Sequence, residues 1–194
     1  MKFNNLKTFF SFFIFIFIST SLSAQVSQTY QRGNLTIEPV IGYERVQRLE
    51  PVARTENRFY YGVRGHYGPD LLSLEAEITQ SRDDDSFPDD DLRIKETSTT
   101  GMLGLRSSFA RGRLFNWYLR AGGHARKVEI TRIEAGIERE IDPAVRVSPY
   151  AGTGLNLNIH EHFKLDAGVT VVFTGHPQGS DREYRTSLGF SFKL

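Results

Sequence analysis

Apolar and polar side chains alternate along most of this chain. From Leu35 onward, apolar residues recur at every second position in segments of about ten residues, separated by polar links. A period of two is typical of β-strands, whose successive side chains point to opposite faces of a sheet. The pattern predicts eight strands, over residues 35–43, 59–67, 72–78, 99–109, 115–125, 145–159, 163–173 and 184–194. We expect each of them to cross a bilayer when tilted.

The links between the predicted strands alternate between short and long. Tight links, at residues 68–70, 110–113 and 160–162, follow the second, fourth and sixth strands. Long polar links follow the other strands, at residues 48–57, 82–91, 131–142 and 174–181. Short turns at one end and long loops at the other are typical of barrels that span a membrane. An even number of strands would place both termini at the short-turn end, in the periplasm.

The composition of the polar face distinguishes a membrane barrel from a soluble ligand-binding barrel. Alternation alone does not, because the strands of both kinds alternate apolar and polar residues. Glycines recur on this face, as at Gly62, Gly122 and Gly152. Glycine weakens a strand that faces water, whereas in a narrow lumen it makes room for a neighbour's long side chain. The glycines favour a membrane barrel, and a soluble periplasmic ligand-binding barrel stays the alternative.

The charged residues on the polar face are balanced in sign. They are Glu38, Glu44, Glu75, Glu77, Glu96, Asp166 and Glu183, against Arg64, Arg106, Arg120, Arg126, Lys164, Arg185 and Lys193. A confined charge is tolerated only when it is paired and hydrogen-bonded, so we predict a salt-bridge network that fills the lumen. We expect its centre to consist of Glu38, Arg64, Glu75, Glu77, Arg120, Arg126, Asp166 and Arg185.

Aromatic residues on the apolar face lie towards the strand ends. Tyr43, Phe59, Phe173 and Tyr184 are near the long links, and Tyr67, Phe109, Phe115, Phe163 and Phe192 are near the short ones. Two aromatic girdles at the membrane interfaces would follow. Taken together, these patterns predict an all-β fold: an eight-stranded antiparallel up-and-down transmembrane β-barrel after an N-terminal signal peptide.

The N-terminal segment has the form of a secretory signal. Residues 1–7 contain two lysines and no acid, and an apolar run rich in Phe and Ile follows over residues 8–18. This run is too short to span a bilayer as a helix. Small and polar residues then lead to Ala24, which predicts a signal peptide over residues 1–24, cleaved near Ala24, and a barrel domain over residues 25–194.

Composition excludes several other classes of protein. The chain has no cysteine, so an exported protein of this kind must be held by its core or by closure of its sheet. Its formal net charge is only +1, which gives no reason to expect a nucleic-acid partner. No residue pattern predicts a cofactor.

The C-terminal residues carry a resemblance to a known family. Residues 187–194 read Ser-Leu-Gly-Phe-Ser-Phe-Lys-Leu. With Gly189, Phe192 and Leu194 they resemble the insertion signal of the small eight-stranded outer-membrane barrels of the outer membrane protein A and X type, among the porin-like β-barrel domains. Leu194 is a departure, since Phe is commoner there. The resemblance covers the barrel domain. It implies a monomer in the bacterial outer membrane, in contact with lipid and lipopolysaccharide and inserted by the barrel-assembly machinery.

Catalysis by such a barrel would require a nucleophile and a base. Some barrels of this size modify lipid A, and the deacylase type resembles His-x-Ser on one strand face. None of the five histidines, His66, His124, His160, His162 and His176, has Ser two residues on. We therefore predict a structural or surface-exposed protein without catalytic residues. A narrow channel or transport component and a lipid A-modifying enzyme stay as alternatives.

Two segments could bind a metal ion. The predicted loop 83–91 contains Asp83, Asp84, Asp85, Asp89, Asp90 and Asp91, which could bind Ca²⁺ or bridge to lipopolysaccharide, although it lacks the Gly and Glu of an EF-hand. A hydrated acidic loop is the simpler interpretation. In residues 160–162, two histidines flank a glutamate, but no third ligand is nearby in the sequence, so we predict no bound metal there.

Overall fold

The computed structural model describes residues 34–48, 54–69, 71–87, 92–110, 114–134, 137–160, 163–175 and 181–192. They belong to one compact unit, Gly33–Leu194. The predicted signal peptide and Leu194 of the predicted insertion signal lie outside the described residues. Within the described part of the chain, no helix is long and apolar enough to span a bilayer.

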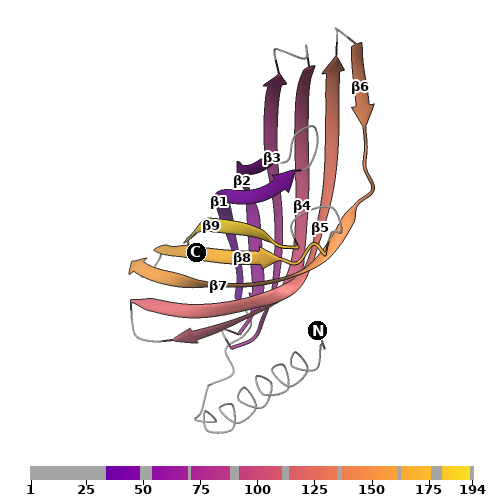
Figure 1. Ribbon diagram of the computed structural model, residues 1–194. Coiled ribbons are helices and arrows are strands. Elements are labelled where there is room, and N and C mark those ends of the chain that lie inside the picture. Colours follow the sequence, from indigo (N-terminus) through magenta and orange to yellow (C-terminus); the bar gives the residue numbers. More distant parts are fainter. Residues whose placement is uncertain are drawn as a thin grey trace, which may run out of the picture. The chain divides into compact units, whose positions relative to one another are not determined.

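The described residues form one closed antiparallel barrel (Figure 1). Its strands are β1 (Asn34–Arg48), β2 (Arg54–Gly68), β3 (Ser73–Phe87), β4 (Leu92–Ala110), β5 (Phe115–Glu134), β6 (Ile137–Ile141), β7 (Arg146–His160), β8 (Phe163–Val172) and β9 (Glu183–Phe192). β5 pairs with β6 near its end and with β7 along its earlier part, so β6 and β7 share one barrel position. Pairing of β1 with β9 and of β4 with β5 closes the sheet. The predicted eight-stranded fold is confirmed.

The strands on the long-link side extend further than the sequence pattern predicts. Pairing continues to Arg48↔Arg54 between β1 and β2, and to Phe87↔Leu92 between β3 and β4. Half or more of each of three of the four long polar links is therefore strand, and β3, β4, β5 and β6 project beyond the rest of the barrel (Figure 1). Apolar and polar residues alternate where the two faces of a strand meet different environments, one apolar and one polar. Where both faces of a strand meet water, the backbone pairing continues but the side chains need not alternate.

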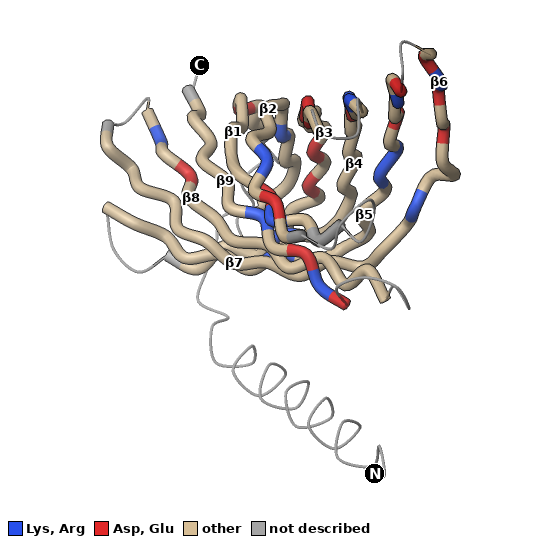
Figure 2. Tube along the Cα trace, turned by 45° about the horizontal axis from the view of Figure 1, so that its top comes forward, with Lys and Arg blue, Asp and Glu red and all other residues tan. Residues whose placement is uncertain are grey.

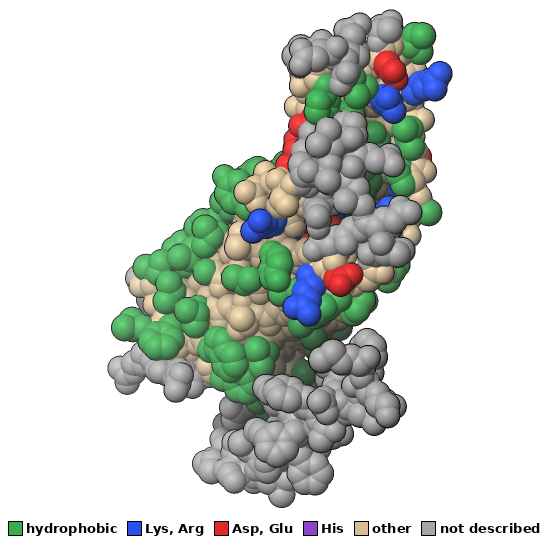
Figure 3. All heavy atoms as spheres, in the orientation of Figure 1, with side chains coloured by type: hydrophobic (Ala, Val, Ile, Leu, Met, Phe, Trp, Pro, Cys, Tyr) green, Lys and Arg blue, Asp and Glu red, His purple; other side chains and the backbone are tan. Residues whose placement is uncertain are grey.

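The barrel is apolar outside and charged inside. On the outer wall, the side chains of Leu35 and Val147 are 65% and 76% exposed, whereas Arg64 in the lumen is 0% exposed. Figure 3 shows hydrophobic side chains over the lower part of the visible face and charged side chains above them. Water would oppose this distribution, whereas lipid favours it, because exposed apolar patches of this size are rare on soluble monomers. This is the surface of a barrel that spans a membrane.

The outer wall also has features suited to lipid. Tyr43 and Phe59 make an edge-to-face contact, with 5.6 Å between ring centroids, near the projecting end. The Trp117 Nε1–H donates a hydrogen bond to Thr153 Oγ1 at 2.7 Å, and the Thr153 hydroxyl donates to the Tyr118 carbonyl oxygen at 2.9 Å. These polar groups are thus satisfied within the wall itself, as a site in contact with lipid requires.

Glycines on the inner face make room for tyrosine rings. A Cβ atom added at Gly154 would collide with the Tyr118 hydroxyl and the Ala167 carbonyl oxygen. The Tyr118 hydroxyl would also lie against a Cβ at Gly168. By contrast, a Cβ at Gly123 would meet nothing within 4 Å, because this residue faces outward. The inner glycines are therefore required by packing in a closed lumen.

Replacing an inner glycine should destabilise the barrel more than replacing an outer one. We expect Gly154→Ala to lower the free energy of unfolding by about 1–3 kcal/mol, because the new methyl group overpacks the lumen. Gly123→Ala should be neutral or slightly stabilising, since alanine restricts the unfolded chain. Urea unfolding in lipid vesicles, followed by Trp117 fluorescence, measures both. Equal effects of the two substitutions would contradict the packing argument.

Candidate functional site

The lumen is the candidate site, because the buried charged side chains of the described residues gather there. The buried arginines are Arg58, Arg64, Arg106, Arg120, Arg126 and Arg185, and the buried acids are Glu38, Glu44, Glu75, Glu77 and Asp166. They occupy alternate positions on their strands, so all face inward. Residues from opposite sides of the barrel meet because eight strands leave an interior only wide enough for side chains.

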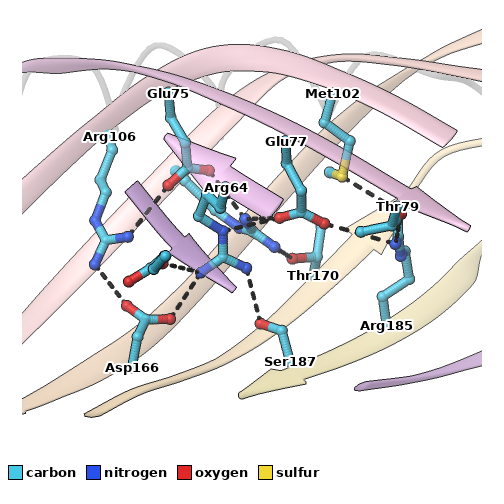
Figure 4. Close-up of polar contacts among 12 residues, drawn as sticks. Arg64, Glu75, Glu77, Thr79, Met102, Arg106, Asp166, Thr170, Arg185 and Ser187 are labelled. Carbon is cyan, nitrogen blue, oxygen red and sulfur yellow. Dashed lines mark hydrogen bonds and ion pairs between the residues drawn. The ribbon is translucent and has the colours of Figure 1, made fainter. Parts of the chain in front are cut away.

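Arg64 on β2 joins three acidic residues from three other strands. Its Nη1 group donates to Glu38 Oε1 at 3.1 Å and to Asp166 Oδ1 at 2.8 Å, and its Nε group donates to Glu77 Oε2 at 2.9 Å. Its Nη2 group donates to Ser187 Oγ at 3.1 Å. One guanidinium group thereby connects β1, β2, β3, β8 and β9 across the lumen (Figure 4).

Arg106 and Arg120 complete a closed ring with Arg64. Arg106 Nη2 donates to Asp166 Oδ2 at 2.7 Å, and Arg106 Nη1 donates to Glu75 Oε2 at 3.2 Å. Arg120 Nη1 donates to Glu75 Oε1 at 2.9 Å and to Glu77 Oε2 at 3.0 Å. Each carboxylate of this ring therefore accepts hydrogen bonds from two arginines.

We call this set the lumen ring. It alternates charge in the order Arg64, Asp166, Arg106, Glu75, Arg120 and Glu77, and then returns to Arg64. Buried charges are expensive to desolvate, and only complete pairing of this kind offsets the cost. The ring crosses the interior and joins strands on its different sides by hydrogen bonds.

Two tyrosines pack the guanidinium groups of the lumen. The Arg106 guanidinium lies 3.7 Å from the Tyr118 ring centroid, and the Tyr118 hydroxyl donates to Asp166 Oδ1 at 2.9 Å. The Arg185 guanidinium lies 4.2 Å from the Tyr60 ring centroid. Each ring therefore fills space and stabilises a cation by its π face.

A second cluster lies beyond the lumen ring, towards the projecting end. Arg126 Nη2 donates to Glu44 Oε2 at 2.8 Å, and Arg126 Nη1 lies 2.8 Å from Glu183 Oε2. Arg185 is placed between the two clusters, with its Nη2 group 3.6 Å from Glu77 Oε1 and its Nε group 3.8 Å from Glu44 Oε2. The ion pairs therefore extend from the ring to the outer part of the lumen.

The acidic segment that the sequence predicts as a loop is largely strand. Asp83, Asp84 and Asp85 lie in β3, where Asp84 is opposite Lys95, while residues 89–91, with the three remaining aspartates, lie outside the described residues. The prediction of a loop at residues 83–87 is wrong, because backbone pairing with β4 continues there and neighbouring cations balance the acids. The Arg93 guanidinium donates to Asp84 at 2.8 Å and 2.5 Å and lowers the pKa of this carboxyl.

Asp83 and Asp85 point to the other face of β3. Together with Glu56 on β2 they offer ligand atoms within 4.8 Å of one another. Arg58 approaches the same group, with its Nε 3.5 Å from Glu56 Oε2 and 3.6 Å from Asp83 Oδ2, and it also pairs with Glu96. A cation there would compete with Arg58, so Ca²⁺ binding by this segment stays a prediction.

The histidines of the lumen do not form a nucleophile and base pair among the described residues. Ser148 on β7 is opposite His124 on β5, a proximity that a search along one strand overlooks. Both ring nitrogens of His124, which is 3% exposed, lack a hydrogen-bond partner within the described part of the chain. A serine activated by histidine needs that hydrogen bond.

Comparison with known proteins identifies the fold. No family model matches the sequence, and no curated protein matches it. Ail, the attachment invasion locus protein of Yersinia pestis, aligns with a TM-score of 0.59 at 16% identity, over 84% of this chain and 100% of Ail. Neisserial surface protein A aligns with a TM-score of 0.57 at 14% identity, again over 84% of this chain and 100% of that one. The chain has the fold of the small eight-stranded outer-membrane barrels.

The predicted site residues lie within this barrel fold. All eight residues expected at the centre of the network are buried on the inner face. Lys164 is exposed, and Lys193 lies outside the described residues. Gly189 of the predicted insertion signal faces inward, where a Cβ would lie 3.1 Å from the Glu38 carboxylate, and Phe192 ends β9.

Sequence reasoning missed two buried contributors. Arg58 falls between the predicted link 48–57 and the predicted strand 59–67, although it continues the inward phase of Tyr60 and Arg64. Tyr118 precedes Arg120 by two positions and was overlooked because it is aromatic rather than charged. Extending the predicted strand by one residue before Phe59 would have placed Arg58 in the lumen, and Tyr118 already shares the inward phase of Arg120 within the predicted strand 115–125.

Breaking the lumen ring should destabilise the barrel strongly. Arg64→Met removes the cation that pairs with Glu38 and one of the arginines that pair with Glu77 and with Asp166, and we expect a loss of about 3–5 kcal/mol in the free energy of unfolding. Arg93→Met removes an exposed partner of Asp84 and should have little effect. The double variant Arg64→Met with Glu77→Gln should recover part of the loss, because it also removes one of the carboxylates that lost this arginine. Urea unfolding in lipid vesicles compares them, and equal effects of Arg64→Met and Arg93→Met would contradict the role of the ring.

Proposed function

We propose that this protein resides in the bacterial outer membrane as a monomeric barrel with a closed lumen, and that it acts as a structural or surface-exposed protein through its projecting strands. The observation that carries this proposal is the combination of an exposed apolar wall with the lumen ring. The wall requires lipid around the barrel, and the ring leaves the interior filled with paired side chains.

The ends of the barrel follow from its topology. β1 begins and β9 ends at the side of the short links, which corresponds to the periplasm in barrels of this kind. The projecting parts of β3, β4, β5 and β6 then extend outward from the cell. Figure 2 shows charged residues gathered on these projecting parts, as expected where strands leave lipid for water.

We infer its partners from the same arrangement. Lipid and lipopolysaccharide would surround the apolar wall, and the barrel-assembly machinery would insert the chain by its C-terminal strand. We propose a non-enzymatic role, since no histidine of the sequence has Ser two residues on. A narrow channel would require the lumen ring to open.

The membrane assignment predicts a heat-modifiable membrane protein. The unheated protein from the membrane fraction should migrate differently on a denaturing gel from the boiled protein, because a closed barrel resists detergent until it is heated. Trypsin added to intact cells should cleave the projecting strands. Recovery of the protein entirely in the soluble periplasm would overturn the assignment.

The closed lumen predicts almost no ion conduction. The purified wild-type barrel in a planar bilayer should show conductance near zero, since the lumen ring blocks the interior. Arg64→Ala, if it folds as judged by heat modifiability, removes the residue that joins five strands and should raise the conductance. Large, stable single-channel currents from the wild-type protein would favour the channel alternative instead.

A further inference from the structure

His124 is a buried histidine that takes no part in the ion-pair network of the lumen. It lies on the inner face of β5, directly opposite Met102 of β4 on one side and Ser148 of β7 on the other. Neither of its ring nitrogens has a hydrogen-bond partner among the described residues. A buried polar ring without hydrogen bonds is uncommon in a folded protein, so its place in the lumen calls for an explanation.

Two arginines lie near His124. Arg126 is two positions further along the same face of β5, which is about 7 Å along the strand. Arg185 extends from β9 on another side of the lumen, and its Nη1 group donates to Met102 Sδ at 3.2 Å (Figure 4). Both arginines would repel a positive charge at His124. The lumen therefore accommodates the uncharged form of this ring.

The nearest acids are already paired. Glu44 Oε2 accepts a hydrogen bond from Arg126 Nη2 at 2.8 Å, and Glu44 Oε1 accepts one from the Ser81 hydroxyl at 3.0 Å. Glu183 Oε2 lies 2.8 Å from Arg126 Nη1. A protonated His124 would gain one of these carboxylates only by displacing Arg126 from it.

Other charged or titratable groups also face this part of the lumen. They are Arg58 and Tyr60 of β2, Glu77 and Asp83 of β3, Glu96 of β4, and Arg146 and Tyr150 of β7. Each acid among them already pairs with an arginine, Glu77 with Arg64 and the other two with Arg58. β8 presents the uncharged Thr170 and Val172 there. Within the described strands, every acid that faces His124 is thus shared with an arginine.

We propose that His124 is an acid-operated switch of the outer part of the lumen. While it is uncharged, the ring lies between Met102 and Ser148 and leaves Arg126 and Arg185 on Glu44. Once protonated, it repels both arginines and competes for Glu44, so the second cluster opens. The lumen ring has its own carboxylates and stays paired. This inference goes beyond the proposed function, which concerns the projecting strands.

Proton uptake determines how the opening depends on pH. The open form binds one proton more than the closed form, at a side chain whose ordinary pKa is about 6.5. The ratio of open to closed barrels should therefore rise about tenfold for each pH unit below this value.

NMR spectroscopy of the full chain, refolded in detergent micelles, tests the switch between about pH 8 and pH 5, the range in which histidines change charge. The imidazole carbon signals of His124 report its protonation, and the side-chain Nε–H signals of Arg126 and Arg185 report their ion pairs. In the wild type we expect all three to change together as the pH falls. The arginine signals of His124→Phe should stay constant over the same range.

Two further variants separate the switch from a purely structural role. His66→Phe removes a histidine two positions from Arg64, towards the short links, and should keep the wild-type response of Arg126 and Arg185. Ser148→Asp places a carboxylate directly opposite His124. It should hold the protonated ring at neutral pH and leave the arginine signals constant, because the new charge is then paired.

Heat-dependent mobility verifies that each variant has formed the barrel before its spectra are compared. Arginine signals that change equally in His124→Phe and in the wild type would overturn the proposal. A wild-type His124 that takes up its proton without any change at Arg126 and Arg185, or that keeps one charge state over the whole range, would overturn it as well.

Discussion

The closed ring of arginines and carboxylates in the lumen is the interaction on which the rest of this structure depends. Arg64, Arg106 and Arg120 share three carboxylates, so that loss of one member removes one of the two ring partners from each of its two neighbours. Removal of these charges from water is expensive, and the ring offsets that cost only while every strand holds its register. The ion pairs therefore act as a constraint on register as much as a source of stability.

The shape of the inner wall follows from this constraint. Large guanidinium groups and tyrosine rings can cross a narrow lumen only where the facing strand carries no side chain, which is where Gly154 and Gly168 lie against Tyr118. The outer wall has no such limit on side-chain size, since lipid accommodates apolar side chains of almost any size. Glycine and charge thus concentrate inside, and aliphatic and aromatic residues outside.

In the projecting strands, the backbone pairing of the barrel continues from lipid into water. Beyond the membrane, cross-strand charge pairs such as Arg93 with Asp84 replace the contact of apolar side chains with lipid. The barrel closes only as far as its shortest strands reach, so the longer ones rise as an open sheet with a free edge at β6. Closure and projection together account for both the charge-filled interior and the exposed edge.

Sequence alone determined the strands, the face that each residue occupies and the presence of charge inside, because alternation is a local property of each strand. Tertiary structure decided which charges meet. Asp166 and Arg64 are 102 positions apart, and their contact depends on the stagger of β8 against β2 around the closed barrel. The inclusion of Arg58, the strand character of Asp83 to Asp85 and the free edge of β6 were also decided there. Each depends on how far along the strands the backbone pairing continues. Where both faces of a strand meet water, the sequence has no apolar pattern that would indicate this extent.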